Sequence, residues 1–199
     1  MKKLFLYIHG KGGSYKEEEI FQNYILNADV VGVDYDDYRP WITRDVILKS
    51  YLKLAPQYDE VNVIANSIGA YFSMLALSGQ DIKSAYFISP VLDMERLILD
   101  MMSWANITES ELEKRKEIPT DFGETLSFEY LTYVKNNPLK WDIKTYILYG
   151  ERDSLIPFET VRNYIKNHDA NLTIMKGGEH YFHTQKQLDC LKNWLKANV

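Results

Sequence analysis

Short apolar runs recur along the chain and alternate with longer segments of helical spacing. The runs are nearly continuous and rich in β-branched or aromatic residues, which is typical of strands in a parallel sheet. They are Leu4 to Ile8, Val30 to Val33, Val61 to Ile64, Ala85 to Ile88, Thr145 to Tyr149 and Leu172 to Met175. Helical patterns such as Arg44 to Ala55 and Ile68 to Leu77 lie between them. This alternation predicts a three-layer α/β sandwich with about six mainly parallel strands and helices on both faces.

One connection is far longer than the rest. Leu92 to Trp141 separates the fourth run from the fifth, and a structureless loop of that length is uncommon in a compact domain. Its Thr, Ser, Asn and Pro punctuation predicts helices around Glu95 to Trp104, Ser110 to Ile118 and Leu126 to Asn136. We therefore expect one domain over residues 1–199, with residues 92–141 as a small helical cap insertion.

Composition narrows the possible partners. The 199 residues are 46% hydrophobic, which is enough apolar area for a folded core and argues against disorder. The net charge of −5 does not suit a protein that neutralises nucleic-acid phosphates. The first apolar run is too short for a signal peptide or a bilayer span, so we expect a cytoplasmic protein without a membrane partner. The single cysteine, Cys190, excludes an internal disulfide.

Two segments superficially resemble ligand-binding loops. The turn from His9 to Ser14 is rich in glycine, but it lacks the Gly-Lys-Ser/Thr ending of a phosphate loop and the glycine spacing of a dinucleotide fingerprint. The acidic segment from Asp34 to Asp37 resembles the start of a calcium loop, yet Arg39 and Asp45 stand where glycine and glutamate are needed. We expect neither a cofactor nor a metal.

Three residues with chemical potential follow three different strands. Ser67 follows the third run between Ala65 and Gly69, small residues that a tight strand-to-helix turn requires. Asp153 follows the fifth run and His180 the sixth. Each alone has an ordinary structural explanation: a serine in a small-residue turn, an aspartate that starts a helix, a loop histidine. Because carboxyl ends of parallel strands share one sheet edge, all three are expected there.

The order serine, acid, histidine resembles that of the α/β-hydrolase superfamily, especially its small single-domain bacterial serine hydrolases and esterases. Four segments carry the resemblance: His9 to Gly13, Ala65 to Gly69, Gly150 to Asp153 and Gly177 to His180. Alanine at Ala65 departs from the more frequent glycine of this turn.

The resemblance implies roles for individual residues. Ser67 would be the nucleophile, His180 the general base and then acid, and Asp153 the carboxylate that orients His180. The backbone N–H groups of Lys11 and Ile68 would stabilise the oxyanion.

Two other histidines lie in or near these segments. His183 is a rival for the base, but His180 directly follows the Gly-Gly-Glu turn and is preferred. His9 is expected to fix the glycine-rich turn by hydrogen bonding.

The expected substrate is a small acyl compound, with a carboxylic ester as the default. Met101, Met102 and Trp104 of the insertion are candidates for an apolar acyl pocket, although packing within the cap would explain them equally. A thioesterase, an amide or peptide hydrolase and an acyltransferase would use the same three residues. A hydrolase-like protein that binds a small ligand without turnover is the non-enzymatic alternative.

Overall fold

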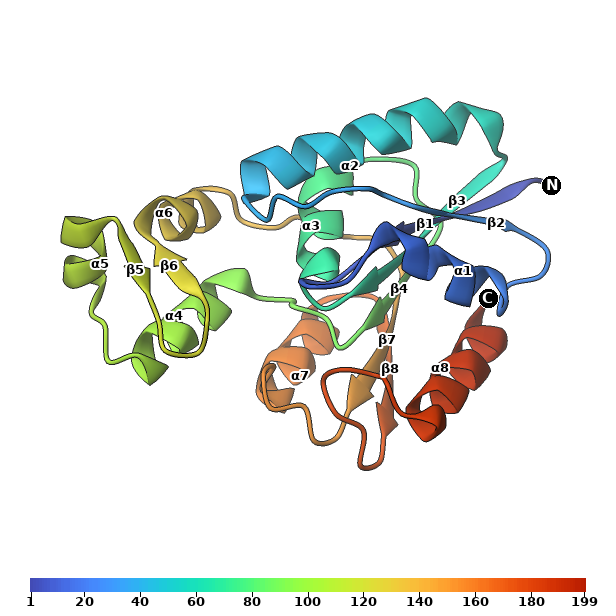
Figure 1. Ribbon diagram of the computed structural model, residues 1–199. Helices are drawn as coiled ribbons and strands as arrows, with labels where there is room; N and C mark the ends of the chain where they lie inside the picture. The colour runs from blue at the N-terminus through green and yellow to red at the C-terminus, as the bar shows by residue number, and fades with distance from the viewer. The chain divides into compact units, whose positions relative to one another are not determined.

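The computed structural model describes residues 1–199, and its main sheet contains the six predicted strands (Figure 1). The strands are β1 (Lys3–Ile8), β2 (Asp29–Gly32), β3 (Glu60–Asn66), β4 (Ala85–Ile88), β7 (Thr145–Gly150) and β8 (Ala170–Met175). They lie in the order β2-β1-β3-β4-β7-β8, and every neighbouring pair is parallel. The prediction of a mainly parallel α/β sheet is therefore confirmed.

Helices cover both faces of this sheet, as Figure 1 shows. On one face lie α1 (Glu18–Gln22) and α8 (Gln185–Asn198), whose Phe21 and Trp194 share a buried core with Tyr7 and Ile64 of the strands. The other face carries α2 (Pro40–Leu54), α3 (Ile68–Leu77) and α7 (Phe158–Asn167). Two short 3₁₀ helices, η1 (Tyr15–Glu17) and η2 (Ala55–Gln57), complete this part of the chain. None of the helices combines the length and the apolar character that crossing a membrane requires.

The chain divides into two compact units. The first consists of residues 1–92 and 140–199 and contains the whole parallel sheet. The second consists of residues 93–139, which fall inside the predicted insertion. Its elements are α4 (Met94–Trp104), α5 (Glu109–Arg115), β5 (Glu117–Pro119), β6 (Thr125–Ser127) and α6 (Phe128–Asn136).

The second unit is not purely helical, which corrects the sequence-based expectation. Helix α5 ends at Arg115, because Lys116 adopts a φ of 67° that breaks the helical path. Ile118 and Leu126, predicted to be helical, are instead buried partners in the antiparallel pair β5 and β6. A turn in which Gly123 has a φ of 86° joins the two strands.

Candidate functional site

Ser67 occupies a sharp turn between β3 and α3. Its φ of 50° and ψ of −119° lie in a region that residues with a side chain rarely adopt. The turn is fixed by hydrogen bonds from the Ser67 N–H to the Ile88 carbonyl (2.9 Å) and from the Val91 N–H to the Ser67 carbonyl (3.0 Å). A Cβ at Gly69 would lie 2.4 Å from the Ile8 carbonyl oxygen, so only glycine allows α3 to start this close to β1. The expectation of small residues in this turn thus has a steric basis at Gly69.

A continuous hydrogen-bonded chain joins Ser67, His180 and Asp153. His180 Nε2 lies 2.9 Å from Ser67 Oγ, and His180 Nδ1 lies 2.8 Å from Asp153 Oδ2. The other carboxylate oxygen of Asp153 accepts hydrogen bonds from the backbone N–H groups of Leu155 and Ile156, both at 2.9 Å. The Asp153 side chain is fully buried, whereas that of His180 is 20% exposed. The structure therefore brings together the three residues that the sequence places at this sheet edge; their catalytic roles remain a prediction.

The alternative explanation of Asp153 as a helix-starting residue does not fit this geometry. Helix α7 begins at Phe158, and its N-cap is Pro157, which provides no side-chain cap. Asp153 lies upstream of this cap and instead closes its own loop while also contacting His180.

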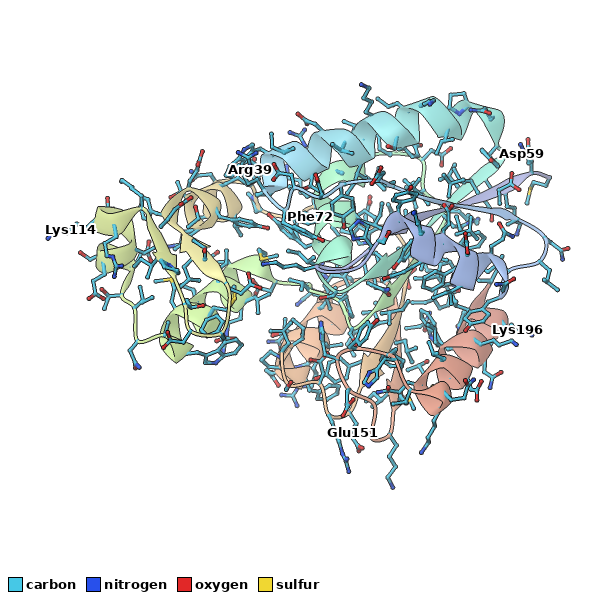
Figure 2. All side chains as sticks on the ribbon, in the orientation of Figure 1. Arg39, Asp59, Phe72, Lys114, Glu151 and Lys196 are labelled. Atoms are coloured by element: carbon cyan, nitrogen blue, oxygen red, sulfur yellow. The ribbon has the colours of Figure 1, made fainter.

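The loops after β7 and β8 are fastened to each other. The Arg152 N–H donates to the Gly178 carbonyl at 2.7 Å, and a Cβ at Gly150 would lie 2.7 Å from the same oxygen. The Glu151 carboxylate accepts a hydrogen bond from the Gly177 N–H at 2.8 Å, and Figure 2 shows Glu151 in the loop after β7. These contacts fix the segment that carries Asp153 relative to the segment that carries His180.

The rival histidine is engaged elsewhere. His183 Nδ1 contacts the Tyr181 carbonyl at 2.8 Å, and its ring stacks on the Tyr181 ring with centroids 5.3 Å apart. The structure places His180, and not His183, against Ser67.

The glycine-rich turn lies directly against Ser67. A Cβ at Gly10 would lie 3.3 Å from the Ser67 Cβ, so the absence of a side chain at Gly10 lets the backbone of the turn approach the serine closely. Lys11 follows Gly10, and Ile68 is the first residue of α3, where an N–H has no acceptor within the helix. Both predicted oxyanion donors therefore belong to segments that border Ser67, and their role as donors remains a prediction.

Solved structures show the same chain path over nearly the full length. Est1E from Butyrivibrio proteoclasticus is 18% identical with a TM-score of 0.76, and the match covers 98% of this chain and 86% of that one. Alpha/beta hydrolase domain-containing protein 10 from mouse is 12% identical with a TM-score of 0.76, covering 98% and 88%. The chain has the α/β-hydrolase fold. An esterase from Pyrococcus furiosus is also similar, with 15% identity, a TM-score of 0.62 and coverage of 98% and 82%. No protein-family model and no characterised sequence matches the chain.

In this α/β-hydrolase fold, His9 holds the glycine-rich turn, as expected from the sequence. The ring is 2% exposed and lies with Nδ1 at 2.9 Å from the Gly10 carbonyl and Nε2 at 3.1 Å from the Tyr35 carbonyl. It stacks on the Tyr35 ring with centroids 4.0 Å apart, and the Tyr35 hydroxyl donates to the His9 carbonyl. Burial raises the pKa of Tyr35, and electrostatic repulsion from Tyr38 and Glu17 raises it further.

A second polar network behind the turn was missed from the sequence. The hydroxyl of Tyr7 donates to the Glu17 carboxylate and accepts from the Asn66 amide at 2.9 Å. Glu17 also accepts from the Ser14 N–H at 3.3 Å, which closes a capping box at η1. Burial and the Glu17 carboxylate raise the pKa of Tyr7, so this hydroxyl stays protonated as a donor. The network ties Asn66, the residue before Ser67, to the end of the glycine-rich turn.

The predicted acyl-pocket residues all lie on α4 of the second unit. Met102 is buried, Met101 is half-buried, and Trp104 is 49% exposed with its ring edge-to-face on Phe122. Packing thus accounts for Met102, while a role of these residues in substrate binding stays a prediction.

The structure contains no group of three or more His, Cys, Asp or Glu side chains arranged to hold a metal ion. In the acidic segment after β2, the Asp37 carboxylate accepts hydrogen bonds from the backbone and the guanidinium of Arg39. These bonds lower the pKa of Asp37. Arg39 is the N-cap of α2 and is labelled at the start of this helix in Figure 2. The Asp37 carboxylate therefore fixes the start of α2 by binding Arg39.

Proposed function

We propose that this protein is a serine hydrolase that cleaves a carboxylic ester through an acyl-enzyme on Ser67. The observation that carries the proposal is the chain of two hydrogen bonds from Asp153 through His180 to Ser67. These residues come from three separate loops, and a nucleophile needs a base within hydrogen-bond distance that is itself held by a third group.

The proton positions follow from the partners. A carboxylate has no proton to give, so His180 Nδ1–H donates to Asp153 Oδ2 and His180 Nε2 is left to accept from the Ser67 hydroxyl. In the first step Ser67 Oγ bonds to the carbonyl carbon of the ester while its proton moves to His180 Nε2. The carbonyl oxygen becomes an oxyanion, which the N–H groups of Lys11 and Ile68 would stabilise.

Collapse of this intermediate breaks the bond to the leaving alcohol, and His180 Nε2 gives its proton to the departing oxygen. The acyl group then remains on Ser67. Water next adds to the acyl carbon and loses a proton to His180 Nε2, and the second collapse returns that proton to Ser67 Oγ. The products are a carboxylic acid and an alcohol, and the protein ends unchanged.

The esterase among the similar structures supports an ester as the substrate. A thioester or an amide would pass through the same steps with a different leaving group, and an acyltransferase would replace water with another nucleophile. A protein that binds a small ligand without turnover would keep the fold and lack a reactive serine.

The test is labelling with a fluorophosphonate, followed by mass spectrometry of the adduct. Because only a base-activated hydroxyl reacts rapidly with this probe, the adduct is expected on Ser67 alone. The Ser67→Ala variant should fold and resist labelling. Ser78→Ala is the matched control, since Ser78 is an exposed serine at the other end of α3 and should leave labelling unchanged.

Turnover of matched p-nitrophenyl ester, thioester and anilide probes then separates the substrate classes. An adduct on Ser14 or Ser154, or an unlabelled wild-type protein, would overturn the assignment of Ser67. A wild-type protein that is not labelled and turns over none of these probes would favour the ligand-binding alternative.

A further inference from the structure

The hydroxyl of Tyr38 contacts both sides of Lys11 in the glycine-rich turn. Tyr38 lies between β2 and α2, in a part of the chain remote in sequence from the turn. The Gly12 N–H donates to Tyr38 Oη at 3.2 Å, and Tyr38 Oη donates to the Gly10 carbonyl oxygen at 3.4 Å. The Tyr38 hydroxyl is thus a donor to Gly10 and an acceptor from Gly12.

The Gly10 carbonyl has two further partners in the turn. Besides the Tyr38 hydroxyl, its oxygen accepts a hydrogen bond from the Gly13 N–H at 3.1 Å and lies 2.9 Å from His9 Nδ1. The peptide bond between Gly10 and Lys11 is trans, so its carbonyl and its N–H point in opposite directions across one rigid plane. Whatever fixes the direction of the Gly10 carbonyl therefore also fixes the direction of the Lys11 N–H.

The Tyr38 ring is itself held in place. It packs edge-on against Tyr35 and His9, with centroids 5.8 Å and 6.4 Å apart, and lies 6.4 Å from Phe72 of α3. The preceding residue is fastened as well, because the Thr43 hydroxyl of α2 donates to the Asp37 carbonyl. Because the Tyr38 ring is fixed by packing, its hydroxyl holds Gly10 and Gly12 in a defined position.

We propose that Tyr38 is a positioning residue that aims the backbone N–H of Lys11 at the oxyanion. The inference rests on the proposed function, and it adds a residue that does not itself touch the substrate. An oxyanion forms in both the acylation and the deacylation step, so a misaligned N–H slows both. Because the Michaelis constant of an acyl-enzyme pathway depends on the ratio of these two rates, it should stay nearly constant while kcat falls.

The test compares Tyr38→Phe with Tyr58→Phe on p-nitrophenyl acetate. Each variant removes one hydroxyl and keeps the ring; Tyr58 bonds Asp29 at 2.8 Å, at the amino ends of the strands, and serves as the control. We expect kcat to fall about tenfold in Tyr38→Phe with KM within twofold, since removal of a whole oxyanion donor costs about 10²–10³. The affinity for a boronic acid, which mimics the tetrahedral adduct, should fall by a similar factor. Tyr58→Phe should behave as wild type in all three measurements.

Amide hydrogen exchange supplies a readout that needs no turnover. In Tyr38→Phe the Gly12 N–H loses its acceptor, so residues 10–13 should exchange faster than in wild type and in Tyr58→Phe. Wild-type kcat in Tyr38→Phe, unchanged exchange in residues 10–13, or a change confined to KM would overturn the inference alone. A wild-type protein that neither hydrolyses the ester nor reacts with fluorophosphonate would overturn the proposed function, and this inference with it.

Discussion

Replacement of Asp153 by asparagine separates the two tasks of this side chain. Asparagine keeps an oxygen that can accept from the N–H groups of Leu155 and Ile156, so the loop after β7 should close as before. The second carboxylate oxygen, which faces His180 Nδ1, becomes an NH₂ group. Since NH₂ can only donate, His180 would have to carry its proton on Nε2, where it can no longer accept from Ser67.

The expected loss of kcat is about 10²–10⁴, which corresponds to roughly 3–5 kcal/mol of transition-state stabilisation. The effect on folding should be much smaller. Asp153→Ala is the informative companion, because it removes the acceptor of two buried hydrogen bonds worth about 1.5–3 kcal/mol each when one partner is charged. Alanine should therefore lose both activity and stability, whereas asparagine should lose mainly activity.

The assay pairs kcat on a p-nitrophenyl ester with the urea midpoint of unfolding for wild type and both variants. Near-wild-type turnover in Asp153→Asn would refute the assignment of Asp153 as the orienting carboxylate. A fall in the unfolding midpoint as large as that of Asp153→Ala would refute the claim that asparagine preserves the loop.

Three further predictions concern other parts of the first unit. His180→Ala should lower kcat/KM on the same ester by about 10³ or more, while His183→Ala should change it by less than about threefold; the reverse order would show that the wrong histidine was chosen. Gly69→Ala should lower the free energy of unfolding by about 1–3 kcal/mol, seen as a lower midpoint of thermal unfolding, and should reduce kcat. The reason is that the new Cβ would lie 2.4 Å from the Ile8 carbonyl oxygen and 2.7 Å from the His9 carbonyl oxygen. A wild-type midpoint together with a wild-type kcat would contradict this steric argument. Burial raises the pKa of Tyr86, Tyr149 and Tyr164 to about 12, so the folded state keeps these protons above pH 10 when the unfolded chain releases them. The free energy of unfolding should therefore fall between about pH 10 and 12, by up to about 1.4 kcal/mol per pH unit for each tyrosine. Urea unfolding at several pH values across that range measures it, and a free energy of unfolding that does not change with pH would contradict the reasoning.

The sequence was sufficient for the parallel sheet because each strand is a short apolar run with clear boundaries. It failed in the second unit, where β5 and β6 have three residues each and show no usable periodicity. The end of α5 was also invisible, since Lys116 adopts a positive φ without being glycine or asparagine. Lysine at this position gives no sequence signal for a helix end. The end of α5 is explained by the strand that follows, in which Ile118 pairs with Leu126.

The candidate site shows the same division. Ser67, Asp153 and His180 could be predicted because each lies in the turn or loop that follows a strand of one sheet, and parallel strands end at the same edge. Tyr38 and Tyr7 could not, because their hydroxyls act on segments far away in the chain. Which backbone group a tyrosine hydroxyl reaches depends on the packing of two loops or strands, and that information is absent from any local pattern. The sequence did show that Tyr38 lies in the loop after a strand, at the carboxyl edge of the sheet, and this was the available sign of a role near the site.

The backbone angle of Ser67 has an evolutionary consequence. A side chain at φ 50° and ψ −119° costs about 1–3 kcal/mol, and glycine would remove most of that cost. Selection for thermal stability alone would therefore favour glycine at this position and discard the hydroxyl. If the proposed function is correct, serine persists there only while catalysis is under selection. A descendant of this chain released from that requirement would gain stability by the single step Ser67→Gly, so glycine at this turn would mark a protein that has lost catalysis.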